Sequence, residues 1–272
     1  MQFKSLLMTA LVALCVASPA LAQTPTDTWV HAFTMNEAPK YPEGFTHFDY
    51  VNADAPKGGM VRMGDMGGFD TFNPILPKGE AAGGAGLVYE TLLTPSLDEN
   101  NTYYGLLAKS LKIAPDYGAV TFRIDPAAKW HDGEPVTAED VVWSFDKAKE
   151  LNPNQAHYYA NVVKAEVTAP GEATFTFDQT GNRELPLILG QLLVLPQHWW
   201  EGTNAKGAKR NIAESTLEAP MGSGPYELAN FDAGRTVTYK RVENYWGATQ
   251  PTRVGTNNFD QYRIEYFLDL TV

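Results

Sequence analysis

The sequence predicts a mixed α/β fold in which strands and helices alternate irregularly around a sizeable core. The chain has 272 residues, of which 44% are hydrophobic and 19% charged, the composition of a globular protein. Segments with the two-residue period of strands are interleaved with segments of helical period. These segments follow no regular strand-helix-strand rhythm and no internal repeat, which favours an α+β or irregular α/β arrangement. The length allows one large or two small domains.

The first predicted element is a secretory leader over residues 1–22. Lys4 supplies a positive charge, residues 6–16 form a short apolar run, and an A-x-A cleavage pattern ends at Ala22. The apolar run is too short to cross a bilayer. We therefore expect cleavage after Ala22 and a periplasmic location.

Charge and cysteine content exclude several function classes. There are 21 Lys and Arg residues against 32 Asp and Glu, a net charge of −11. An acidic surface repels phosphate backbones, so nucleic acid is not an expected partner. The single cysteine, Cys15, lies in the leader. The exported chain is therefore expected to have neither disulfides nor thiol catalysis.

The segment after the leader is rich in glycine, proline and aromatic residues. Residues 60–63 are predicted as a strand, preceded by a turn at 56–59. Residues 83–93 are predicted as a helix, since their apolar side chains recur at helical spacing. That apolar face consists of Leu87, Val88, Leu92 and Leu93.

The middle of the chain predicts a strand followed by a capped helix. Residues 120–124 alternate between apolar and polar side chains, as in a half-buried strand. Thr137 is the expected helix N-cap, and Asp140 three residues later resembles the second member of a capping box. The helix should end near Asn152, because the residue before a proline disfavours helical dihedrals.

The last third predicts further strands and one compact apolar segment. Strand patterns occur at 173–177, 237–241 and 262–266. The apolar segment covers residues 185–195.

The histidines offer little catalytic or metal-binding chemistry. No two of them stand at i, i+3 or i+4, and no cysteine could join them in a zinc site. His131 and Asp132 could form the acid-base pair of a secreted hydrolase. Neighbouring side chains on a turn usually point apart, and Asp132-Gly133 is ordinary turn chemistry. We therefore expect no catalytic residue and no metal or other cofactor.

Aromatic doublets are the more conspicuous feature. Rigid aromatic side chains supply binding area at low entropic cost, although most of them pack in cores. On a strand, one ring of a doublet faces inward and the other outward. The doublets are Tyr103-Tyr104, Tyr158-Tyr159, Trp199-Trp200 and Tyr245-Trp246.

Several motifs resemble those of one known family. The segment AKWHDGEPVTAEDVVWSF at 128–145, GSGPYEL at 222–228 and ENYWG at 243–247 stand in the order found in extracytoplasmic solute-binding proteins of family 5. These are the receptors of ABC importers for peptides, dipeptides and nickel. The stretches at 40–52 and 69–74 resemble the oligopeptide and microcin C-binding branch of that family.

The resemblance implies a type II periplasmic binding protein architecture. Residues 23–82 would form the first part of the main subdomain of lobe I, and residues 83–196 an inserted small subdomain. Residues 197–272 would complete the main subdomain and end at the crossover to lobe II. Family members are considerably longer, so lobe II is expected to be missing from this sequence.

The resemblance also implies the ligand contacts and partners. Relatives contact ligand just after the segment that matches residues 72–74, and again through an aromatic residue after the capped helix. In this sequence the first contact corresponds to Lys78, Gly79, Glu80 and Ala81. The second corresponds to Tyr158 or Tyr159. The implied partners are an oligopeptide or a peptide-like compound such as microcin C, and an ABC permease with its ATPase. The receptor is expected to be a monomer.

Three alternatives remain open from the sequence. A metal or metallophore receptor of the same family would use His131, His157 or His198. A secreted hydrolase would use His131 with Asp132. The third alternative is a truncated chain without function.

Overall fold

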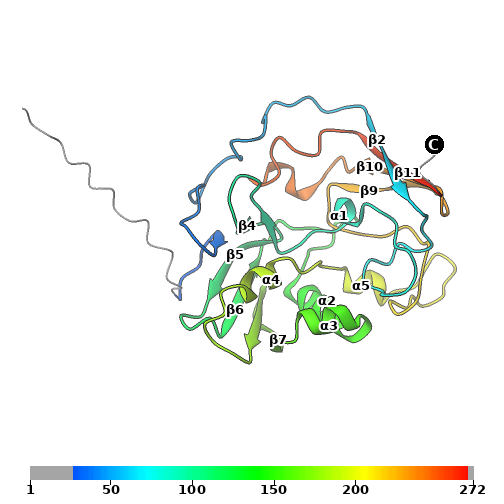
Figure 1. The fold of residues 1–272 in the computed structure, drawn as a ribbon. Coiled ribbons are helices and arrows are strands. Elements are labelled where there is room, and N and C mark those ends of the chain that lie inside the picture. The colour runs from blue at the N-terminus through cyan, green and yellow to red at the C-terminus, as the bar shows by residue number, and fades with distance from the viewer. Residues whose placement is uncertain (1–26, 269–272) are drawn as a thin grey trace, which may run out of the picture.

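The computed structural model describes residues 27–268, and Figure 1 shows their arrangement. The predicted leader and its cleavage site after Ala22 lie outside the described residues. Within residues 27–268, no helix is both long enough and apolar enough to span a bilayer. The helices are α1 Ala85–Val88, α2 Ala138–Leu151, α3 Pro153–Tyr158, α4 Leu185–Gly190, α5 Gln197–Trp200 and the 3-10 turn η1 Trp246–Thr249.

The strands form three sheets. The strand bounds are β1 Ala32–Thr34, β2 Met60–Met66, β3 Leu93–Pro95, β4 Thr102–Gly105, β5 Ala108–Ile113, β6 Ala119–Ile124, β7 Val162–Ala169, β8 Glu172–Phe177, β9 Tyr226–Asp232, β10 Thr236–Arg241 and β11 Gln261–Phe267. Their orders are β1-β4-β3, β5-β6-β8-β7 and β2-β11-β10-β9. The pair β2 and β11 is parallel, so the third sheet joins the early and late parts of the chain. Figure 1 shows this sheet on the side opposite to α2, α3 and β7.

Helix α2 begins and ends where the sequence predicts. The Thr137 hydroxyl accepts from the N–H of Asp140 at 3.1 Å, and the Asp140 carboxylate accepts from the N–H of Thr137 at 2.9 Å. These bonds satisfy backbone donors that have no partner within the helix. Asn152 ends α2 in an extended conformation and caps α3 with its side chain. The capped helix and its end near Asn152 are thus confirmed.

The helix predicted for residues 83–93 is wrong over most of its length. Only Ala85–Val88 are helical, after Gly84 with φ +93° and without a side-chain cap. The rest of the segment is extended because it pairs with remote partners. Thr91 bridges to Leu193, and β3 pairs with β4. Of the leucines of the expected helical face, Leu92 and Leu93 are fully buried in the core and Leu87 is partly buried.

The other predicted elements are confirmed, with small shifts in their bounds. The strand patterns at 60–63, 120–124, 173–177, 237–241 and 262–266 correspond to β2, β6, β8, β10 and β11. The apolar segment 185–195 contains α4 and continues as extended chain. The fold is therefore mixed α/β, as predicted.

Two large apolar clusters make up the core. One packs α2 against the sheet of β5 to β8, and the other surrounds β9, β10 and β11. Met221 contacts both clusters, so they adjoin. Near the N-terminus, Val30 bridges to Leu111 and β1 pairs with β4. The segment before residue 83 therefore pairs with strands of the predicted small subdomain, whose limits stay a prediction.

Candidate ligand-binding site

The segment Lys78–Ala81 lies exposed on the surface in a fixed conformation. The Asp70 carboxylate accepts from the N–H of Glu80 at 2.8 Å, and the N–H of Asp70 donates to the carbonyl of Glu80 at 2.9 Å. Gly79 has φ +87°, and a Cβ there would lie 2.7 Å from Asp70 Oδ1. Glycine is therefore required at this position. Asp70 holds the segment from one side and leaves the other side open.

The open side of this segment carries backbone groups available to a ligand. Ala81 forms a parallel bridge with Thr71, closed by a bond from Ala82 N–H to Thr71 carbonyl at 2.9 Å. Within residues 27–268, the N–H and C=O of Gly79 and of Ala81 form no hydrogen bond. Unpaired main-chain groups at an exposed edge of this kind can form hydrogen bonds with the backbone of an extended ligand.

The two predicted tyrosines occupy different environments at the end of α3. Tyr159 is 4% exposed, and its ring packs against Phe145 with centroids 5.3 Å apart. This burial raises the pKa of Tyr159 well above its usual value. Tyr158 is 46% exposed, and its ring lies 5.3 Å from that of Tyr159. Tyr158 is thus the ring open to a ligand, and Tyr159 supports it.

A cavity of about 510 Å³ lies beside these tyrosines, and we call it the Tyr158 cavity. Its walls come from Pro74 and Ile75, the facing sides of α2 and α3, and residues 191–193. The amide of Asn152 donates to the carbonyl of Ile75 at 2.9 Å and so joins two of these walls. The structure thus brings Tyr158 and Tyr159 to the loop after residues 72–74. Lys78–Ala81 follow that loop but do not line the cavity.

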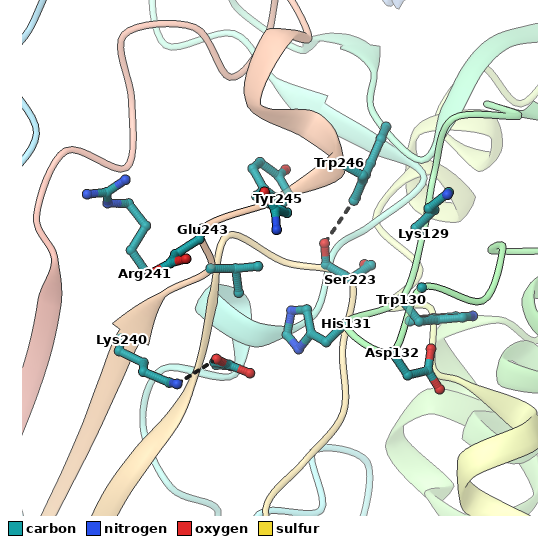
Figure 2. A pocket seen from close by; sticks show the side chains of 14 residues that line it. Lys129, Trp130, His131, Asp132, Ser223, Lys240, Arg241, Glu243, Tyr245 and Trp246 are labelled. Atoms are coloured by element: carbon teal, nitrogen blue, oxygen red, sulfur yellow. Dashed lines mark hydrogen bonds and ion pairs between the residues drawn. The ribbon is translucent and has the colours of Figure 1, made fainter.

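A second cavity, of about 660 Å³, lies between the turn at 129–133 and the end of β10 with residues 242–246 (Figure 2). His131 ties the turn to residues 222–224, of which Ser223 lines the cavity. Its Nε2 lies 2.8 Å from the carbonyl of Gly224, and its Nδ1 accepts from the N–H of Gly222 at 3.4 Å. Burial lowers the pKa of His131, and a neutral ring protonated at Nε2 satisfies both contacts.

His131 and Asp132 do not face one another as an acid-base pair. Both ring nitrogens of His131 are engaged by the backbone of residues 222–224, while Asp132 pairs with His198 at 2.9 Å. The side chains of His131 and Asp132 point apart, as expected for neighbours on a turn. The partner of Asp132, His198, lies 66 residues further along the chain. Among residues 27–268, no group of three His, Cys, Asp or Glu side chains could hold a metal ion.

A buried carboxylate beside the second cavity was not found from the sequence. Glu90 is 2% exposed and accepts hydrogen bonds from the Tyr245 hydroxyl and from Trp246 Nε1, the latter at 2.9 Å. Arg253 lies 3.4 Å from the same carboxylate. Burial raises the pKa of Glu90, and these three donors oppose that effect. The doublet Tyr245-Trp246 therefore serves to satisfy a buried charge.

The doublet Trp199-Trp200 belongs to the core. Both side chains are buried, and their rings lie edge to face with centroids 4.8 Å apart. Arg210 covers the ring of Trp199 at 4.1 Å. Two aromatic doublets stand at helix ends, Tyr158-Tyr159 at the end of α3 and Trp199-Trp200 at the end of α5. Of these, only Tyr158-Tyr159 presents a ring to solvent.

Comparison with known proteins agrees with this fold. The model of "Bacterial extracellular solute-binding proteins, family 5 Middle" matches residues 102–272. The probable peptide-binding protein YejA of Agrobacterium fabrum is 49% identical over 270 residues, which cover 99% of this chain and 44% of that protein. The chain thus spans less than half the length of this relative.

Solved structures share the fold at lower identity. The ABC transporter substrate-binding protein CtaP of Listeria monocytogenes is 24% identical, with a TM-score of 0.60 over 79% of this chain and 41% of that one. The oligopeptide-binding protein AppA of Bacillus subtilis, solved with a nonapeptide, is 20% identical, with a TM-score of 0.60 and the same coverage. The fold is that of part of a type II periplasmic binding protein. The chain belongs to the bacterial extracellular solute-binding proteins of family 5.

Proposed function

We propose that this chain is the peptide-capturing part of the substrate-binding protein of an ABC importer. The observation that carries the proposal is the exposed segment Lys78–Ala81, which bends at Gly79 and carries free main-chain groups at Gly79 and Ala81. The exposed ring of Tyr158 is a second candidate contact. Main-chain hydrogen bonds hold extended peptides without reading their side chains. The name of the relative YejA as a probable peptide-binding protein supports the same ligand class.

The importer would use the receptor in the periplasm, after removal of the predicted leader. The captured oligopeptide, or a peptide-like compound such as microcin C, would pass to a membrane permease driven by an ATPase. Hinge closure on ligand requires contacts from two lobes, because only differential binding shifts the population toward the closed form. We assign residues 23–82 and 197–272 to the main subdomain of one lobe and 83–196 to its inserted subdomain.

Binding by this chain alone is expected to be weak. In the proposed mechanism the second lobe contributes its own contacts, including an acidic partner for the peptide amino terminus. A dissociation constant in the micromolar range or below for the 272-residue chain would contradict the two-lobe mechanism.

The main-chain contact can be tested by NMR, which detects weak binding. Adding a short alanine peptide to the leader-free chain should shift the amide resonances of Gly79 and Ala81. A peptide N-methylated on its backbone should shift them much less, because its donors are blocked. Ala81→Pro removes a free N–H and should weaken binding, whereas the control Ala81→Ser retains that donor.

Equal shifts with the alanine peptide and its N-methylated form would refute main-chain recognition at this segment. Shifts confined to other regions would refute the placement of the peptide there. The N-methylated peptide keeps the test valid even where Ala81→Pro disturbs the bridge to Thr71, because it leaves the protein unchanged.

A further inference from the structure

Strand β2 forms an open edge of its sheet. It pairs with β11 on one side, and among residues 27–268 no strand or bridge lies on its other side (Figure 1). Along its whole length only Val61 is half-buried, and the other residues are exposed. Proteins commonly protect such an edge with lysine, proline or a β-bulge. The sequence MVRMGDM has neither residue, and its register with β11 is unbroken.

Hydrogen bonds at the two ends of β2 show which main-chain groups point at β11. The N–H of Gly67 donates to the carbonyl of Phe267 at 2.9 Å. The carbonyl of Gly59 accepts from the N–H of Gln261 at 3.2 Å. The odd-numbered residues of this stretch therefore point their main-chain groups at β11.

The even-numbered residues point their main-chain groups at the open edge, because these groups alternate in direction along a strand. The N–H of Met66 is taken by the Asp65 carboxylate at 2.9 Å. Arg62 and Gly64 are left with an unpaired N–H and C=O each. Unpaired groups of this kind are a template for a further strand.

The side chains of β2 also lack partners. Met60, Met63 and Met66 are 43%, 50% and 49% exposed. Within residues 27–268, the guanidinium of Arg62 forms no ion pair and lies in register beside Arg263 of β11. Apolar side chains that gather on an exposed edge favour burial against a partner.

We propose that β2 pairs antiparallel with β2 of a second copy of this chain, across a two-fold axis at Met63. In this register Arg62 stands opposite Gly64 of the second copy, and each exchanges N–H···O=C bonds with the other. Met60 stands opposite Met66 of the second copy. The two Met63 residues meet at the axis in a position without hydrogen bonds, where Cα atoms approach to about 4.5 Å.

Charge complementarity supports this register. Arg62 faces Gly64 of the second copy, which has no side chain to block it. Gly64 lies in register beside Glu265 of β11, so the guanidinium extends toward a carboxylate of the second copy. Within its own chain, that carboxylate contacts only Arg263, at 2.7 Å.

Other registers are less favourable. A two-fold axis at Arg62 places the two arginines directly opposite one another, which is destabilising. An axis at Gly64 places Asp65 opposite Met63 and leaves Met60 beyond the end of the partner strand. A shift by one residue places Arg62 opposite residues whose main-chain groups point at β11, so no hydrogen bonds form across the edge.

The pairing would join two four-stranded sheets into one continuous sheet. A contact limited to one strand of each copy is smaller than a standard interface, and the net charge of −11 opposes association. We therefore expect a weak dimer whose population rises with concentration, in place of the monomer expected from the family resemblance. The inference does not depend on peptide capture, because none of Lys78–Ala81 lies on β2.

Sedimentation velocity on the leader-free chain over a series of concentrations measures the association. Gly64→Pro removes a donor that points at the open edge and leaves the donors that point at β11. It should raise the dissociation constant of the dimer about tenfold or more, because each half of the dimer loses a hydrogen bond. The matched control Gly64→Ala keeps that donor. A Cβ at residue 64 lies 3.4 Å from the ring of Phe267, so both variants carry the same additional contact.

A second pair of variants tests the axis. Met63→Asp brings two like charges together and should also weaken the dimer about tenfold or more, whereas Met63→Leu should retain it. This pair carries the comparison if Gly64→Pro fails to fold. Hydrogen exchange locates the interface, since the amides of Arg62 and Gly64 should exchange more slowly as the protein concentration rises. The amide of Val61 should be protected at every concentration by β11.

Three results would overturn the proposal. The first is a monomeric mass at every concentration. The second is a dimer that neither Gly64→Pro nor Met63→Asp weakens, which would place the interface elsewhere. The third is a monomer in which the alanine peptide slows exchange at Arg62 and Gly64, which would assign the open edge to an extended ligand.

Discussion

Removing the carboxylate of Glu90 should destabilise the fold more than most single substitutions. Glu90 lies between α1 and β3, while its partners Tyr245, Trp246 and Arg253 come from the last 30 residues. The side chain of Glu90 is fully buried, and that of Arg253 is 22% exposed. Glu90→Ala would leave a largely buried guanidinium without a counter-charge and the Tyr245 hydroxyl without its acceptor.

The expected loss follows from these contacts. Removal of one partner of a buried ion pair costs about 3–5 kcal/mol. Trp246 keeps a second acceptor, the carbonyl of Ser223 at 3.0 Å, so its indole adds little to the loss. Glu90→Gln keeps the volume and one acceptor oxygen, and its cost should be smaller, about 1–3 kcal/mol.

Urea denaturation followed by tryptophan fluorescence measures both variants. The double variant Glu90→Leu with Arg253→Met removes both charges and should cost less than Glu90→Ala alone, which leaves the charge of Arg253 unpaired. The reasoning would be refuted if Glu90→Ala lowered the free energy of unfolding by less than about 1 kcal/mol, the value of an ordinary hydrogen bond.

Two further predictions concern local stability. Thr137→Ala removes half of the capping box with Asp140 and should cost about 1 kcal/mol in urea denaturation, whereas Thr137→Ser should retain the cap. The pKa of His131 is lowered by burial, so below pH of about 6.5 the unfolded chain binds a proton that the folded chain excludes. The contribution of His131 is thus present above that pH and is lost as the pH falls toward the lowered pKa. As the pH is lowered from 7 to 5, the urea concentration at the unfolding midpoint should fall more steeply for the native protein than for His131→Asn. A parallel pH dependence of the two proteins would contradict this account.

The sequence predicts correctly those elements that are determined by residues close to one another along the chain. The capping box at Thr137 and Asp140 forms within four residues, and the alternation at 120–124 needs only one buried face. The helix prediction for residues 83–93 is wrong because this segment is determined by partners far away in the sequence. Its leucine spacing suits a helix, but the bridge from Thr91 to Leu193 and the pairing of β3 with β4 favour extended chain. The hydrophobic period of a short segment gives no information about partners that lie so far away in the sequence.

The candidate site was predictable only through family resemblance. The resemblance indicated both tyrosines at the end of α3 without distinguishing them. Packing of Tyr159 against Phe145 of α2 decides which ring is exposed, and this contact forms only in the folded chain. The amides of the Tyr158 cavity carry no sequence motif, because Gln155 and Gln191 meet only in the folded chain.

Asn152 explains why these residues form a prepared site. Its position before Pro153 ends α2, its oxygen caps α3, and its amide donor holds the loop at Ile75. Asn73 ties the same loop to the carbonyl of Ile212 at 2.7 Å. The backbone of the cavity walls is therefore held in place before a ligand arrives. A wall held in this way spends little binding energy on ordering its main chain. Differences in affinity between ligands should then reflect contacts with the side chains that line the cavity, including Tyr158, and little movement of the backbone in this part of the protein.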